Sequence, residues 1–279
     1  MQPRLFTRFL GKKTLLTLIT ILTVFPFLWI VMLSFKTDIQ ILTKPFSLPE
    51  SLNIDNYIRA LKTLDITTMF GNTIIISIVA LAISLVFSFM SSYCISRMYF
   101  GKKRGNTALY LLFISGLTIP PYILIFPIYR ITIALNLTNT RLALILPLAA
   151  TTLALDTLLF VGTLRDFPAE IEDAAIIDGC NLFQLCTRVV LPIIRPVVMT
   201  IVVFNVIHFV NEYAISSVLI NKPEMYTLSL TTSMFKSKYG MDFSGLIAAT
   251  NLIVLPEIIF YALFQKYIVG GMTAGAVKG

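Results

Sequence analysis

Five of the chain's 14 acidic residues lie between positions 166 and 178, inside an otherwise apolar stretch. They are Asp166, Glu170, Glu172, Asp173 and Asp178. Grouped carboxylates can act as acids and bases, bind a metal ion, or dock against another protein. Acid–base and metal chemistry would need further partners, and the chain has one histidine, His208, and three cysteines without a C-x-x-C spacing. The window therefore predicts a docking surface.

The same window has the signals of a helical hairpin. Asp166 can cap a first helix, whose early carboxylates oppose the positive end of the helix dipole. Gly179 can adopt the left-handed conformation that ends this helix. Asn181, with a glutamine three residues later, has the spacing of a capping box for a second helix, which Pro192 is expected to end. A helix–turn–helix is therefore predicted over residues 165–190.

One face of the first predicted helix is formed by Ile171, Ala174, Ala175 and Asp178, at helical spacing. Small side chains on an exposed face allow another protein to approach closely. The alternative is an amphipathic connector lying on the membrane, which predicts bulky apolar residues and lysines on opposite faces. This helix has two alanines and no lysine, so docking is favoured.

A second polar group lies within the apolar segment 191–214. Asn205, His208, Asn211 and Glu212 are spaced so that they could line one face of a helix. Polar groups are costly in lipid and suggest a substrate path that binds hydroxyl groups. Hydrogen bonding between helices is an equal alternative for Asn205 and His208.

Two isolated carboxylates, Asp156 and Glu257, also fall within apolar segments. A buried pairing and a water-filled neighbourhood explain them as well as contact with a substrate does.

The composition predicts what surrounds these groups. The chain has 279 residues, of which 57% are hydrophobic and 13% charged, and its mean hydropathy is +0.85. A soluble domain has roughly 25% charged residues, so this chain lacks the charge for a water-exposed surface. The net charge of +8 comes from basic residues at the ends of apolar runs, the pattern of a membrane protein and not of a nucleic-acid-binding stripe.

Six apolar segments are long enough to cross a bilayer as helices. They lie near residues 14–34, 70–94, 107–129, 142–164, 191–214 and 246–267. The first is expected to be a retained helix and not a cleaved signal peptide. Of the 22 Lys and Arg residues, 13 fall in segments that six spans place on the side of the termini, which makes that side cytoplasmic. The expected fold is a single all-α integral membrane domain over residues 1–279.

A sequence pattern in the hairpin resembles a known signature. Asp173-Ala174-Ala175 is followed by Asp178-Gly179 and, after nine residues, by Val189-x-Leu191-Pro192. It is similar to the Glu-Ala-Ala signature of permease subunits of ATP-binding-cassette importers, with Asp in place of Glu and Val in place of Ile.

Three further stretches resemble the carbohydrate-importer group that contains the shorter maltose permease subunit. They are "FPFLWIVMLSFKT" (25–37), "VNEYAISSVLI" (210–220) and "FQKYIVGGMTAGAVKG" (264–279). In the second, Val210 stands where that group usually has tryptophan.

The resemblance implies an assembly at the prokaryotic plasma or inner membrane. It comprises this subunit, a second homologous permease, two ATPase subunits and an external solute-binding protein. No G-x-x-x-x-G-K-[ST] motif occurs, so ATP and Mg²⁺ are expected on the partner ATPases and no cofactor or enzymatic activity on this chain. The tail 273–279 is a further candidate for contact with the ATPases.

The resemblance also implies which residues couple to the ATPases. They are Glu170, Glu172, Asp173, Ala174, Ala175, Asp178, Gly179, Leu191 and Pro192.

Other functions remain open at this point. An importer of a glycerol phosphoester or another polar solute fits the same pattern. A secondary transporter would need more intramembrane charges for ion coupling, and a membrane enzyme would need a catalytic cluster that the sequence lacks.

Overall fold

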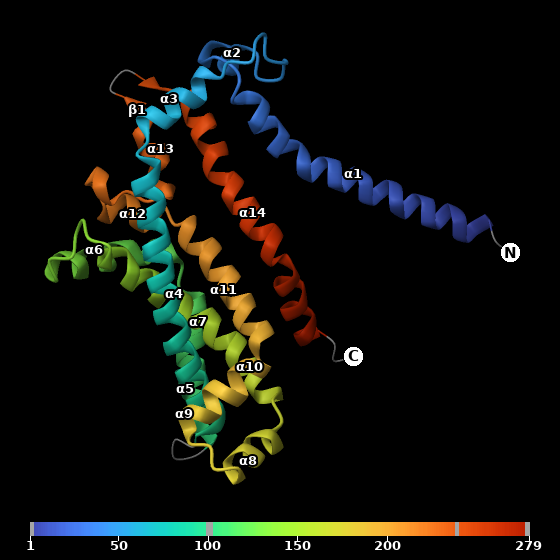
Figure 1. Cartoon of the computed structure of the whole chain (residues 1–279), viewed down its shortest axis with the longest axis vertical. Coiled ribbons are helices and arrows are strands. Elements are labelled where there is room, and N and C mark those ends of the chain that lie inside the picture. The colour runs from blue at the N-terminus through green and yellow to red at the C-terminus, as the bar shows by residue number, and fades with distance from the viewer. Residues whose placement is uncertain (1–2, 99–102, 238–239, 277–279) are drawn as a thin grey trace. The chain divides into compact units, whose positions relative to one another are not determined.

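The computed structural model describes residues 3–98, 103–237 and 240–276, so the last three residues of the tail 273–279, predicted to contact the ATPases, lie outside the described residues. The chain divides into two compact units. The first unit contains residues 1–65 and 231–256, and the second contains residues 66–230 and 257–279 (Figure 1).

The first unit is formed by helices and one short hairpin. Its elements are α1 (Pro3–Leu33), α2 (Asp38–Thr43), α3 (Asp55–Thr63), α13 (Thr231–Met234), β1 (Lys236–Ser237), β2 (Gly240–Met241) and the first part of α14 (Phe243–Ala276). The two strands are antiparallel, with Lys236 opposite Met241. Helix α1 has no buried residue in its apolar stretch Lys13–Leu33, so this stretch must be covered by lipid or by another subunit.

The segment after α1 folds around a buried lysine. Lys36 is fully buried, and its Nζ donates to the carbonyl oxygens of Lys44 at 2.8 Å and Pro45 at 3.0 Å. Asn56 is also buried and donates to the carbonyl oxygen of Lys36 at 2.8 Å. Arg59 of α3 forms an ion pair with Asp242 at 3.4 Å. These bonds hold residues 34–63 together as one folded segment, the cap of the first unit.

The second unit contains the remaining elements. They are α4 (Ile66–Arg97), α5 (Lys103–Ser115), η1 (Gly116–Thr118), η2 (Pro121–Leu124), α6 (Ile125–Ala134), α7 (Leu142–Asp166), α8 (Ala169–Ile177), α9 (Leu182–Gln184), the π-helix η3 (Leu185–Val190), α10 (Leu191–Ile193), α11 (Arg195–Val210), α12 (Ala214–Leu219), η4 (Pro223–Met225), η5 (Leu228–Leu230) and the rest of α14.

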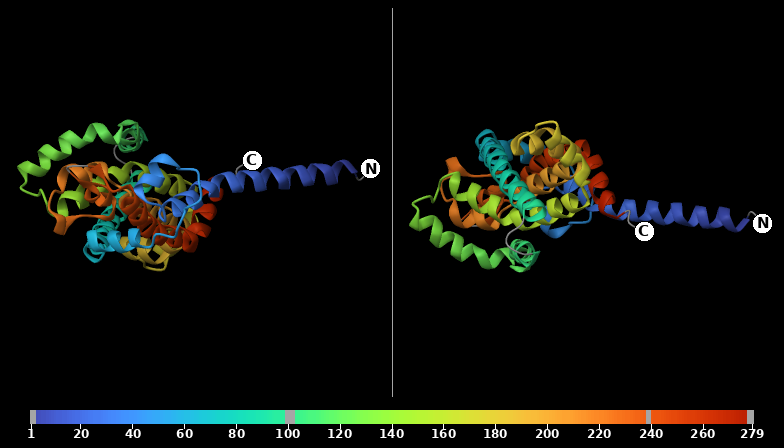
Figure 2. Two further views of the ribbon diagram at one scale, coloured as in Figure 1. Left: turned by 90° about the horizontal axis from the view of Figure 1, so that it is seen from above. Right: turned by 90° about the horizontal axis from the view of Figure 1, so that it is seen from below.

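Helices α4 and α7 pair along their lengths, and α11 packs against both. In Figure 1, α8 and α9 lie at one end of this pair and α12 lies at the other. Figure 2 places α6 (green) at the edge of the unit, outside the α4–α7–α11 bundle. The core is divided between the two ends: one cluster includes Ile76, Leu144 and Leu219, and the other includes Phe89, Phe160 and Val190.

The expectation of an all-α membrane fold is confirmed. Among the described residues, four helices are long and apolar enough to cross a membrane: Lys13–Leu33, Ile66–Arg97, Leu142–Asp166 and Phe243–Gln265. Two bent pairs raise the possible number to six.

The predicted spans 107–129 and 191–214 are wrong as single continuous helices. The first bends by 94° between Thr118 and Pro121, and the second by 80° between Ile193 and Arg195. Proline explains both breaks, because Pro120, Pro121 and Pro196 cannot donate the backbone hydrogen bonds that a continuous helix needs.

Candidate functional site

The predicted hairpin is present in the second unit and turns at the predicted residue. Gly179 follows α8 with φ of +85°, a conformation that L side chains rarely adopt. Asn181 then caps α9: its side chain accepts from the Gln184 backbone at 2.9 Å, and the Gln184 side chain accepts from the Asn181 backbone at 3.0 Å. Two helical segments are thus joined by a turn with defined geometry on both sides.

Two details of the predicted hairpin are wrong. Asp166 does not cap α8, because α7 continues through it and the residue before α8 is Pro168, which has no capping side chain. Pro192 does not end the second half of the hairpin. It lies within the continuous helical stretch Leu182–Ile193, directly after the π-helical segment, and the chain bends at Ile194 instead.

The exposed face of α8 also differs from the prediction. Ala175 is buried in the cluster with Phe89 and Phe160, while Ala174 is exposed. Glu172 is 7% exposed, and both of its carboxylate oxygens accept from Nε of Arg97, at 2.9 and 2.8 Å. Neither Ala175 nor Glu172 is therefore available on the free surface of this chain.

The other predicted coupling residues lie at or near the surface. Glu170, Asp173, Asp178, Gly179 and Pro192 are exposed. Leu191 is half-buried and packs against the inner cluster. The acidic residues of α8 thus divide into an exposed group and one buried partner, Glu172.

Sequence reasoning missed the apolar tip of the hairpin. Large apolar side chains flank the Gly179 turn on both sides and stay exposed: Ile176 57%, Ile177 85%, Leu182 52% and Phe183 75%. The turn of the hairpin therefore carries a patch of exposed apolar side chains, and patches of this kind are typical of interaction sites. The sequence signal for this tip is the presence of bulky apolar residues on both sides of a glycine turn.

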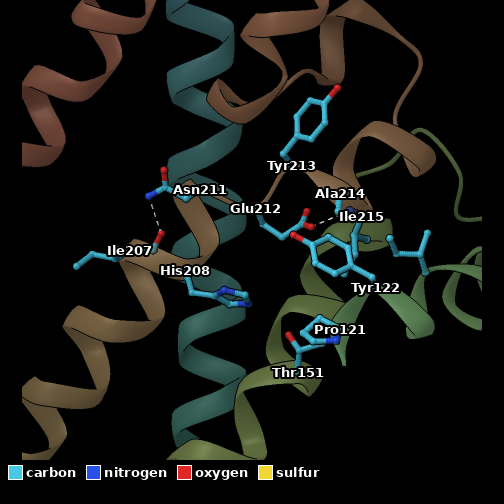
Figure 3. Close-up of a pocket in the computed structure, with 11 residues that line it drawn as sticks. Pro121, Tyr122, Thr151, Ile207, His208, Asn211, Glu212, Tyr213, Ala214 and Ile215 are labelled. Atoms are coloured by element: carbon cyan, nitrogen blue, oxygen red, sulfur yellow. Dashed lines mark hydrogen bonds between the residues drawn. The ribbon is translucent and has the colours of Figure 1, made fainter. Parts of the chain in front are cut away.

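A cavity of about 540 Å³ lies at the other end of the second unit, where α11 breaks into α12. His208, Asn211 and Glu212 line it together with Tyr122 and Thr151. In Figure 3, His208, Glu212 and Tyr122 point towards the same space. Three of the four predicted path residues are therefore brought together, and Tyr122 joins them from the segment 116–134.

Glu212 accepts hydrogen bonds from the first turn of α12 at this break. Its carboxylate accepts from the backbone N–H of Ile215 at 2.7 Å and of Ser216 at 3.0 Å, and also from the Ser216 hydroxyl at 3.0 Å. A carboxylate before a helix start satisfies N–H groups that have no partner within the helix. Glu212 thus fixes the direction in which α12 leaves α11.

Asn211 lies one residue past the end of α11. Its amide donates to the carbonyl oxygen of Ile207 at 3.0 Å and to Oε2 of Glu257 at 3.4 Å. The contact gives Glu257 a partner beside the cavity.

Asn205 does not belong to this cavity. It is 1% exposed, and its amide donates to Oδ2 of Asp156 at 2.8 Å and to the Ser84 hydroxyl at 3.3 Å. These contacts join α11 to α7 and α4. Asn205 thus does not line the cavity with the other three predicted path residues, and its contacts are those of the alternative, hydrogen bonding between helices. His208, in contrast, faces the cavity.

The described residues contain no group of three or more histidine, cysteine, aspartate or glutamate side chains placed to hold a metal ion. The second unit thus has an exposed apolar tip at one end and, at the other, a cavity lined by apolar, aromatic and a few polar side chains.

Comparisons with known proteins identify the family to which the chain belongs. Residues 92–273 match the family model of the binding-protein-dependent transport system inner membrane component. The chain is 32% identical to the probable starch degradation products transport system permease protein AmyC of Thermoanaerobacterium thermosulfurigenes, covering 96% of this chain and 97% of the relative. It is 29% identical to the diacetylchitobiose uptake system permease protein NgcG of Streptomyces coelicolor, covering 96% and 88%.

A solved structure gives the same fold. It is a bacterial ABC transporter involved in the import of the acidic polysaccharide alginate, with a TM-score of 0.75, 21% identity, and coverage of 95% of this chain and 96% of that one. The chain thus belongs to the family of inner membrane components of binding-protein-dependent transport systems, and it is a multi-pass membrane permease of an ABC importer.

Proposed function

We propose that this permease forms half of the translocation path for a sugar or oligosaccharide. The proposal is carried by the cavity at the α11–α12 break. Exposed aromatic rings and hydrogen-bonding groups line it: Tyr122 is 76% and Tyr213 47% exposed, and His208 and Asn211 lie beside them. Aromatic faces with a few polar groups suit a solute that is rich in hydroxyls and has apolar ring faces. The relatives named for starch degradation products and diacetylchitobiose support this class of solute.

The hairpin is proposed as the attachment point for a separate ATPase. Its tip presents Ile177 and Phe183, and the exposed Glu170 and Asp173 lie on the adjoining helix. An apolar centre with a charged rim has the composition of a protein interface. Residues 165–190 are accordingly cytoplasmic, as are both termini.

The full assembly is proposed to contain a second homologous permease, two ATPase subunits that bind ATP and Mg²⁺, and an external solute-binding protein. This chain contributes no catalytic group to ATP hydrolysis.

Transport by the reconstituted complex tests the proposal. Proteoliposomes with ATP inside and the binding protein outside should accumulate a labelled oligosaccharide, while a glycerol phosphoester serves as the competing solute. Tyr122→Ala should lower uptake, and Tyr261→Ala, a tyrosine of α14 that is 48% exposed and does not line the cavity, should not.

Two results would contradict the proposal. One is ATP hydrolysis by the purified chain alone. The other is accumulation that continues without ATP while an ion gradient is maintained, which would indicate a secondary transporter.

A further inference from the structure

The ion pair between Arg97 and Glu172 joins two elements that the chain does not connect directly. Arg97 is the last residue of α4, and Glu172 lies in α8, 75 residues later. The guanidinium also donates through Nη2 to the carbonyl oxygen of Phe167 at 3.1 Å. One side chain of α4 thus holds both α8 and the turn that leads into it.

This contact is directional and shielded from water. The Glu172 side chain is 9% exposed and that of Arg97 is 21% exposed. The surrounding cluster, with Phe89, Tyr93 and Ala175, keeps α4 and the hairpin together, but apolar contacts do not fix a direction. The Arg97 guanidinium is held at two atoms, because Nε donates to the Glu172 carboxylate and Nη2 donates to the Phe167 carbonyl oxygen, so a displacement of α8 must displace the end of α4.

The opposite end of α4 is clamped as well. Asn72 is 1% exposed, and its amide donates to the carbonyl oxygens of Glu224 at 2.9 Å and Tyr226 at 3.1 Å. Its own carbonyl oxygen accepts from Nε of Arg141 at 3.1 Å. These partners belong to the segment that follows α12, and to the residue that precedes α7.

Helix α4 is the continuous element between these clamps. It contains no proline among its 32 residues. At the rise of an α-helix, 32 residues correspond to a length of about 48 Å. Of the two helices that the chain joins directly to the hairpin, α11 is separated from it by the 80° bend, and α7 is continuous but contains Pro147 towards its far end. A proline or a bend absorbs displacement that an unbroken helix passes on.

We propose that Arg97 and Glu172 are positioning residues that make α4 a relay between the hairpin and the segment 222–226. Movement of the hairpin by the ATPase pulls on Arg97, and α4 carries that movement to the outer segment next to α12. The inference rests on the proposed docking of the hairpin to an ATPase.

The test is a double-mutant cycle in the reconstituted complex. Glu172→Gln keeps the size of the side chain but leaves Arg97 without a counter-charge, and Asn72→Ala releases the far end of the same helix. Each should keep the ATPase subunits attached while lowering the ratio of solute taken up to ATP hydrolysed by about 5-fold or more. The double variant should be no worse than the more severe single variant, because both cut one relay.

Glu50→Gln is the matched control, because Glu50 pairs with Lys44 at 3.6 Å in an exposed ion pair. It should leave the ratio unchanged. The relay is wrong if Glu172→Gln and Asn72→Ala keep the wild-type ratio, or if their effects multiply in the double variant. If the Glu172→Gln complex lost its ATPase subunits, the Arg97–Glu172 pair would be needed for ATPase attachment, and this result would also overturn the relay. If the wild-type complex itself shows no hydrolysis stimulated by the binding protein, the proposed function fails, and the relay fails with it.

Discussion

Removing one ring from the hairpin tip should weaken attachment of the ATPase without harming the permease. Phe183 is 75% exposed, so Phe183→Ala removes few contacts within the chain. Full burial of a phenylalanine side chain contributes about 1.5–3 kcal/mol. Three quarters of that surface is still available for burial, which corresponds to about 1–2 kcal/mol on docking. At about 1.4 kcal/mol for a tenfold change, the dissociation constant should rise roughly 5- to 30-fold.

The assay is a titration of labelled ATPase subunit onto the purified permease pair, with thermal unfolding of the permease measured in parallel. Leu48→Ala is the control: Leu48 is 79% exposed and lies in the cap that follows the first span, on the side opposite the proposed cytoplasmic N-terminus. It should change neither the dissociation constant nor the unfolding temperature.

Unchanged ATPase affinity in Phe183→Ala would refute the docking role of the tip. If the variant instead weakened association of the hairpin with lipid vesicles, the segment would be the amphipathic membrane connector considered as the alternative.

Three further substitutions test separate parts of the structure. Gly179→Val should cost about 1–2 kcal/mol because φ is +85°, although the space around a Cβ is open; ATPase retention should fall, while Gly179→Asn, which tolerates this conformation, should retain it. Glu212→Ala removes the acceptor for the first N–H groups of α12 and should cost about 1 kcal/mol, lowering uptake while the assembled complex is still recovered on size exclusion. Asn205→Leu removes the donor that Asn205 supplies to the buried Asp156, and it should lower the unfolding temperature of the permease through a loss of about 1–3 kcal/mol of folding free energy. Unchanged values in any of these three assays would contradict the corresponding assignment.

Much of this protein is determined by local sequence. Apolar runs of spanning length predict helices in lipid, because a helix satisfies its backbone hydrogen bonds within itself. The turn of the hairpin is equally local: a glycine at positive φ, followed by an asparagine and glutamine that cap each other, is decided within six residues. The prolines at 120, 121 and 196 indicate both bends, whereas apolar length alone predicts a continuous span.

Tertiary structure decided which side of the hairpin faces the rest of the chain. Helical spacing groups Ala175 with Ala174, yet only Ala174 is exposed, because the core formed by Phe89 and Phe160 lies against the other side of the helix. The same packing buries Glu172 against Arg97, a residue 75 positions away in the sequence. Periodicity defines the faces of a helix, but the direction of each face depends on contacts between distant segments, and those contacts form only when the helices pack.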